Sequence, residues 1–309
     1  MNFFKLLGLG YKNYWNGLKF IFANRLYWFL IFPMILFVCF YWLGTYFEKL
    51  EGSVGYDIKH NIDEITTLNG LTWMTLKMIF YQKMYYLFTK STIYFVIILL
   101  SPVLAVVSEK VEAILVGNKY PWNFMQLVKD IKRAIRLNMR LILVEYTIII
   151  AVIVIGSFLT GPANFILVYV LPMIVGFYFY GFGFIDYVNE RRRLNIAQSI
   201  HFVSRHKGLA FALGSVFSIC FYSFLFSWNS FQSAPIDTNS QIFWGTVVVI
   251  TFSLVAIAPL AAVVSSTMSI HDLVDLSKNQ YAHKKQVTSN EEKTTETKET
   301  DDTQAESSN

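Results

Sequence analysis

Arg25, Tyr27 and Trp28 are the first residues of this 309-residue sequence whose types and spacing suggest chemistry, because they stand at the start of a long apolar run. An arginine offers a permanently charged fork of donors that suits an oxyanion, and the aromatic residues add a hydroxyl and an indole N–H. The stretch predicts either an anion-binding site or a membrane-surface anchor. In the second case Arg25 reaches lipid headgroups and the rings lie in the interfacial aromatic belt.

Two pairs of charged residues form a second candidate set. Glu109 and Glu112 are three residues apart, as are Arg133 and Arg136, so each pair shares one face of a predicted helix. The carboxylates could therefore meet the guanidiniums across a helix pair. Such contacts are either ordinary surface ion pairs or part of an ion pathway.

Glu145 is a candidate because it lies four residues inside an apolar segment, where ionisable groups often have functional roles. We expect its side chain either to act there or to reach headgroups or a base such as Arg140. The sequence has no nucleophile elbow, P-loop or paired catalytic carboxylates, and its histidines lack metal-ligand spacing. We therefore expect neither an enzyme nor a cofactor or metal.

Composition predicts the membrane that must surround these residues. The chain is 54% hydrophobic and 15% charged, and residues 146–185 contain no Asp, Glu, Lys or Arg. As one helix that run would be roughly 60 Å long, about twice the hydrocarbon core, so it must fold back, most simply at Gly161-Pro162. We predict an all-α membrane protein with about six hydrophobic helices, at 26–47, 84–107, 141–160, 163–185, 208–228 and 241–264.

Basic residues predict the orientation. The regions 1–25, 108–140, 186–207 and the tail hold 21 of the 26 Lys and Arg residues and fall on one side of six spans. By the positive-inside rule that side is cytoplasmic, with both termini inside and residues 48–83 in an outer loop. The basic stripes also predict contacts with anionic lipids, or an electrostatic funnel for an anion.

Three regions divide the chain. Residues 1–25 mix aromatic residues with spaced lysines, which predicts an amphipathic interfacial helix. Residues 26–276 form the helical membrane domain, and within it 122–140 and the stretch after Arg191 predict further basic amphipathic helices. Residues 277–309 are polar and charged, which predicts a disordered tail. Cys39 and Cys220 lie in apolar segments and indicate no disulfide framework.

Four stretches together resemble a known family. They are "SPVLAVVSEKVEAILVG", "KDIKRAIR", "DYVNERRRLNIAQSIHFVSRHKGLAFALG" and "APLAAVVSSTMSIHD". The matching positions are Pro102, Glu109, Glu112 and Gly117; Lys129, Asp130 and Arg133; Asp186, Tyr187, Arg191, Arg192, His206 and Gly214; and Pro259, Ala262, Thr267 and Asp272. Over residues 10–275 the sequence resembles the CysZ-type sulfate permease family, within the wider group of etoposide-induced membrane proteins.

The resemblance implies an oligomeric inner-membrane protein that admits sulfate, with some helix pairs forming re-entrant hairpins that do not cross the bilayer. We predict a pathway or ion-pair network that combines the matching residues Glu109, Glu112, Arg133, Asp186, Arg191, Arg192 and His206 with Arg136 and Glu145, which were identified from their own positions. The family tends to carry two arginines at the start of the first span, where this chain has Tyr27 and Trp28. Arg25 lies two residues earlier and could share a helix face with Trp28.

Two functions remain open from the sequence. The first is a permease or channel for a small inorganic anion, most simply sulfate or a related oxyanion. The second is a non-transporting membrane protein of the same superfamily that organises lipids or partner proteins, which the missing arginine pair favours. In either case we expect a homo-oligomer in the bacterial inner membrane and no nucleic-acid partner.

Overall fold

The computed structural model describes residues 2–39, 42–46, 49, 68–118, 124–235 and 237–278. These residues form helices and turns and contain no strand, which confirms the all-α prediction. The predicted tail beyond residue 278 and most of the predicted outer loop lie outside the described residues.

The first helix ends in a sharp bend before the first apolar segment. Helix α1 spans Phe3–Ala23, and a 3-10 helix, Leu26–Leu30, follows and continues as α-helix through residues 31–39 and 42–46. Between them Arg25 adopts the left-handed conformation, with φ 55° and ψ 31°. The expectation that Arg25 and Trp28 share one helix face is therefore wrong, because the helix is interrupted at Arg25.

Helix α3, Leu68–Val116, is much longer than predicted. Its 49 residues would extend roughly 74 Å at the α-helical rise. The predicted loop over 48–83 is therefore wrong from residue 68 onward. The first turns of α3 contain too many polar residues for a hydropathy pattern to detect, but a helix satisfies its own backbone hydrogen bonds without an apolar face.

Two helical hairpins form the rest of the molecule. Helix α4, Phe124–Ser157, joins the predicted amphipathic helix and the third span into one element. The chain then reverses at Gly161, whose φ of 67° and ψ of −147° suit glycine, and Pro162 starts the short helix α5, Pro162–Phe165. A π-helical turn, Ile166–Val170, leads into α6, Leu171–Arg191, so the predicted hairpin turn is confirmed.

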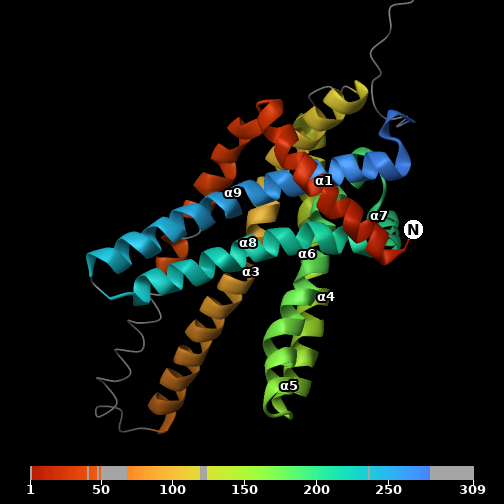
Figure 1. Cartoon of the computed structure of the whole chain (residues 1–309). Helices are drawn as coiled ribbons and strands as arrows, with labels where there is room; N and C mark the ends of the chain where they lie inside the picture. The colour runs from red at the N-terminus through yellow and green to blue at the C-terminus, as the bar shows by residue number, and fades with distance from the viewer. Residues whose placement is uncertain are drawn as a thin grey trace, which may run out of the picture.

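The second hairpin consists of α8, Lys207–Ser233, and α9, Thr238–Val274. The short helix α7, Ile196–Arg205, precedes this hairpin and begins with a capping box between Asn195 and Gln198. This confirms the predicted helix in the stretch after Arg191. Figure 1 shows α8 and α9 side by side, running across α6, with α1 crossing them at an angle and contacting both. The core therefore lies where the two hairpins, α1 and the end of α3 meet.

Small residues allow the hairpins to approach closely. A Cβ at Gly181 of α6 would overlap the carbonyl oxygen of Ala210 of α8, and one at Gly214 would overlap the carbonyl oxygen of Phe177. The backbones of α6 and α8 are therefore in direct contact. Tight contact through small residues is typical of helices packed within a membrane.

Among the described residues, six helical stretches are long and apolar enough to cross a membrane, which confirms the predicted number. They are Leu26–Tyr46, Tyr94–Val116, Ile131–Gly156, Pro162–Arg191, Lys207–Ser233 and Thr238–Val274. The second and third differ most from the prediction, because α3 and α4 continue without a break through their less apolar ends.

Asp237 caps α9 at the tip of the second hairpin. Its carboxylate accepts a hydrogen bond from the backbone N–H of Ser240 at 3.0 Å, which lowers the pKa of Asp237 below its usual range. In the unfolded chain the pKa of Asp237 is about 4, and in the folded protein it is lower. The ionised cap therefore stabilises the fold at pH values above the unfolded-state pKa, and this stability is lost as the pH falls through the pKa of the folded state. In Asp237→Asn the cap persists without titrating. We expect wild-type thermal stability to fall more steeply than that of Asp237→Asn below about pH 4; equal slopes would contradict this.

Candidate functional site

Arg133 is the centre of a cluster of buried charges where α4, α6 and the start of α7 meet. Its Nη2 donates to Asp186 Oδ1 at 2.8 Å and its Nε to Asp186 Oδ2 at 3.3 Å, so the pair is bidentate. The same Nε lies 3.5 Å from Glu190 Oε1, and Nη1 donates to the carbonyl oxygen of Leu194. The guanidinium therefore faces two carboxylates and a carbonyl.

A second ion pair joins α6 to α3. Arg191 Nε lies 3.1 Å from Glu112 Oε2, and the exposed fractions of the two side chains are 6% and 1%. The other carboxylate oxygen of Glu112 accepts from Asn118 Nδ2 at 2.7 Å. Asn118 also donates to the carbonyl oxygen of Leu276 at 3.0 Å, just beyond α9. We call Glu112, Arg133, Asp186, Glu190 and Arg191 the charged cluster.

Polar side chains of α6 and α7 support the charged cluster. Ser199 donates to Asp186 Oδ1 at 2.6 Å, and Asn189 donates to Ser199 Oγ at 3.0 Å. Arg192 donates to Asn189 at 3.3 Å, and its guanidinium lies 5.2 Å from the ring centre of Phe202. Burial lowers the pKa of Arg192, an effect that the nearby Glu112 opposes. Asp186 is thus held from two helices.

Glu145 lies further along α4, between α3 and α6. Its side chain is buried, and it accepts a hydrogen bond from the hydroxyl of Tyr94 on α3. The ring of Tyr180 on α6 meets Tyr94 edge-on, with 5.3 Å between ring centres. The Glu145 carboxylate also lies against Gly176, where a Cβ would be 3.3 Å from Oε1. The expectation that Glu145 reaches headgroups is wrong, because only 1% of it is exposed.

Further buried polar groups lie on α3, α4 and α6 between Glu145 and the charged cluster. Asn138 lies seven residues before Glu145 on α4, and its Oδ1 faces Gly183 of α6. Tyr187 of α6 donates to the carbonyl oxygen of Ile97 of α3 at 2.9 Å. Ser101 of α3 is buried, and neither its Oγ nor Asn138 Oδ1 has a hydrogen-bond partner among the described residues.

We call Tyr94, Ser101, Asn138, Glu145 and Tyr187 the polar seam. Along α4, Glu145 of the polar seam lies roughly 18 Å from Arg133 of the charged cluster. Buried polar groups at membrane depth are costly, so such a row is typical of a pathway for ions or of a helix contact that must be specific. In this structure the cluster arginines hold carboxylates, so an anion that binds them must compete with these carboxylates.

The remaining predicted residues lie apart from the polar seam. Arg25, Tyr27 and Trp28 are exposed at the bend after α1, and the two rings are 5.7 Å apart. Arg136 is exposed on α4. The ion pairs found here are Glu112 with Arg191 and Arg133 with Asp186, and the meeting of Glu109 and Glu112 with Arg133 and Arg136 stays a prediction.

Two further predicted residues border the cluster. Glu109 is half-buried one turn before Glu112 on α3. His206 lies between α7 and α8, where its Nδ1 is 2.8 Å from the carbonyl oxygen of Phe202 and its ring stacks on Phe202, 4.4 Å between centres. His206 therefore closes the turn that positions α7 against the cluster.

Sequence reasoning missed several partners in this site, three neutral and one acidic. Tyr94, Asn138, Ser199 and Glu190 were not candidates, although each contacts or aligns with a predicted residue. One signal was present: Asn138 and Glu145 are seven residues apart, two helical turns on one face of an apolar stretch. The partners from other helices depend on packing that no local pattern contains.

These features define an all-helical integral membrane protein with a buried charged cluster between its helices. The family described as sulfate transporter CysZ/etoposide-induced protein 2.4 matches residues 13–228. The chain belongs to this family. The match ends before α9, so the resemblance at 259–272 lies outside it. No curated protein matches the sequence.

Proposed function

We propose that this protein is a permease for a small inorganic anion, with sulfate or a related oxyanion as substrate. The observation that carries the proposal is the bidentate contact of Arg133 with buried Asp186 at one end of the polar seam. An arginine fork that binds a carboxylate in this way also fits the oxygens of a tetrahedral oxyanion. Family membership supports transport rather than catalysis.

The transport step follows from competition at Arg133 and Arg191. Each guanidinium holds a carboxylate when no anion is bound, so the positive charges are compensated and the helices are held together. An incoming oxyanion that replaces Asp186 at Arg133 loosens the contact between α4 and α6, and one that replaces Glu112 at Arg191 loosens the contact between α6 and α3. Arg136 is exposed about one turn along α4 from Arg133 and raises the local anion concentration.

The bend after α1 is a second, outlying anion contact in this proposal. Arg25 is exposed there beside the rings of Tyr27 and Trp28, and it provides one charge where the family tends to have two. We therefore expect weak binding of a divalent anion at this point. Its role is to deliver the anion rather than to hold it.

We place the protein in the bacterial inner membrane as a homo-oligomer, with both termini cytoplasmic. Two contacts support this orientation: Glu112 of region 108–140 pairs with Arg191 of region 186–207, and Asn13 of region 1–25 donates to Asp272 near the end of α9 at 2.8 Å. The crossing of the two hairpins in Figure 1 supports the proposal that one of them enters the bilayer obliquely, as a re-entrant hairpin.

A second function is favoured by the aromatic residues at the bend. Tyr27 and Trp28 replace the expected arginines, and 65% of Trp28 is exposed. An exposed indole at the membrane surface suits an interfacial anchor. If the purified protein shows no anion uptake, we propose that it is a membrane organiser of the same superfamily, which binds lipids or partner proteins.

Radiolabelled sulfate uptake into proteoliposomes tests the permease proposal. We expect uptake above that of empty liposomes and competition by excess sulfite. Arg25→Ala should lower the initial rate about tenfold at low sulfate concentration, because a charge-assisted hydrogen bond contributes about 1.5–3 kcal/mol. Arg205→Ala, which removes another exposed arginine, is the control. Uptake equal to that of empty liposomes would reject sulfate as substrate, and equal rates in both variants would reject the role of Arg25.

A further inference from the structure

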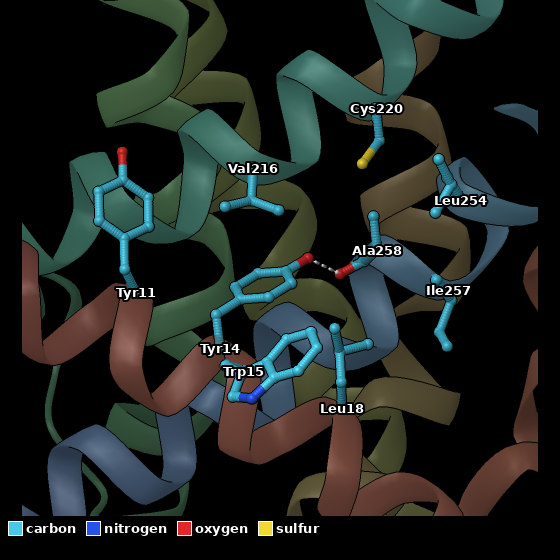
Figure 2. A pocket seen from close by; sticks show the side chains of 9 residues that line it. All are labelled: Tyr11, Tyr14, Trp15, Leu18, Val216, Cys220, Leu254, Ile257 and Ala258. Atoms are coloured by element: carbon cyan, nitrogen blue, oxygen red, sulfur yellow. Dashed lines mark hydrogen bonds between the residues drawn. The ribbon is translucent and has the colours of Figure 1, made fainter.

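An apolar groove lies between α1, α8 and α9, on the outside of the bundle. Its volume is about 270 Å³, and its walls include Tyr14, Trp15 and Leu18 of α1, Val216 and Cys220 of α8, and Leu254 of α9. Figure 2 shows these side chains around the groove, with the ring of Tyr14 between Val216 and Trp15 and its hydroxyl directed to Ala258. This region is separate from the charged cluster and from the bend at Arg25.

The polar groups at the groove's edge are already used within the protein. Tyr14 donates its hydroxyl to the carbonyl oxygen of Ala258 at 2.8 Å, and burial raises the pKa of Tyr14, so it remains a neutral donor. The hydroxyl of Tyr11 lies 2.9 Å from Ser215 Oγ. The groove therefore presents mainly hydrocarbon to an occupant, which excludes the transported anion as its ligand.

The rim of the groove on α1 is basic and aromatic. Lys12 and Lys19 are exposed, three residues before and four residues after Trp15, so all three lie on neighbouring turns of one face. Lys19 Nζ lies 5.4 Å from the ring centre of Trp15, and α1 contains no acidic residue. The ammonium groups of Lys12 and Lys19 and the indole of Trp15 therefore line the α1 side of the groove's rim.

We propose that this groove binds one acyl chain of an anionic phospholipid whose headgroup contacts Lys12 and Lys19. Charge complementarity selects the lipid: an acyl chain gains little by leaving one hydrocarbon environment for another, so the headgroup decides which lipid binds. Trp15 lies at the boundary between chain and headgroup, where indole rings are favoured. The proposal does not depend on anion transport.

Native mass spectrometry of the purified protein tests this. The protein is equilibrated with phosphatidylglycerol or with phosphatidylcholine of identical chains, and retained lipid is counted per protomer. Lys12→Gln/Lys19→Gln removes the headgroup contact, and Leu254→Trp fills the groove from its open side, where Leu254 is 46% exposed. Lys129→Gln/Lys132→Gln removes two exposed lysines of α4 and is the matched control.

We expect one phosphatidylglycerol to be retained by the wild type and by the α4 control. The α1 double variant should lose affinity about fivefold for each lysine removed, and Leu254→Trp should lose retained lipid of both kinds. Equal retention of both lipids by the wild type would overturn the headgroup assignment. Unchanged retention in Leu254→Trp, or a changed protomer count in place of lipid loss, would overturn the groove as a lipid site.

Discussion

Arg133→Gln should reduce the initial rate of sulfate uptake at least about tenfold and destabilise the protein by about 3–5 kcal/mol. The guanidinium contacts Asp186 and Glu190, and the exposed fractions of these carboxylate side chains are 6% and 10%. Without Arg133 both carboxylates lose their shared counter-charge inside the bundle. Uptake is measured in proteoliposomes, and stability is measured by thermal unfolding in detergent.

Two further variants separate transport from stability. Arg140→Gln removes an exposed arginine two helical turns along α4 and should change neither quantity. Arg133→Gln/Asp186→Asn removes both charges, so it should recover part of the lost stability while uptake stays low. Wild-type uptake in this double variant would show that Arg133 only holds the helices together, and would remove the cluster from the pathway.

Much of the helical fold was predictable because membrane helices depend on local properties. Apolar length predicted six spans, and Gly161-Pro162 predicted a turn, because only glycine readily adopts the positive φ found there. The start of α3 at Leu68 was not predictable in this way. Hydropathy detects helices that face lipid, and a polar helical extension has no such pattern.

The candidate site was only partly predictable for a related reason. A charge in an apolar run identified Glu145, and the family pattern identified Arg133 and Asp186. The partners were not predictable, because they depend on how α3 and α6 are rotated against α4. The tyrosine that reaches Glu145 comes from 51 residues away, and a hydroxyl among many aromatic residues carries no distinguishing signal.

Arg25 shows how one residue's backbone can change an interpretation. Periodicity placed it on a helix three residues before Trp28, but its φ of 55° ends that helix. Left-handed backbone is uncommon for residues other than Gly, Asn and Asp, so no sequence pattern predicted it. Its side chain therefore projects from a turn, which supports a contact on the route rather than a site within a span.

Gly181→Ala should prevent α6 and α8 from packing and destabilise the protein by about 3 kcal/mol or more, or leave it unfolded. The added methyl group would overlap the carbonyl oxygen of Ala210, a backbone atom that cannot rotate away as a side chain can. The two helices would have to separate at the point where their backbones touch. Thermal unfolding of the purified protein, together with its yield in the membrane fraction, measures the effect.

Gly183→Ala on the same helix is the matched control for this prediction. A methyl group there would meet Ile97 Cγ2 at 3.6 Å and Asn138 Oδ1 at 3.8 Å, which are ordinary contact distances. Since alanine also favours helix more than glycine does, this variant should be as stable as the wild type or slightly more stable. If the two alanine variants unfold at the same temperature, the α6–α8 contact is looser than described, and the two hairpins can slide or separate without breaking the fold.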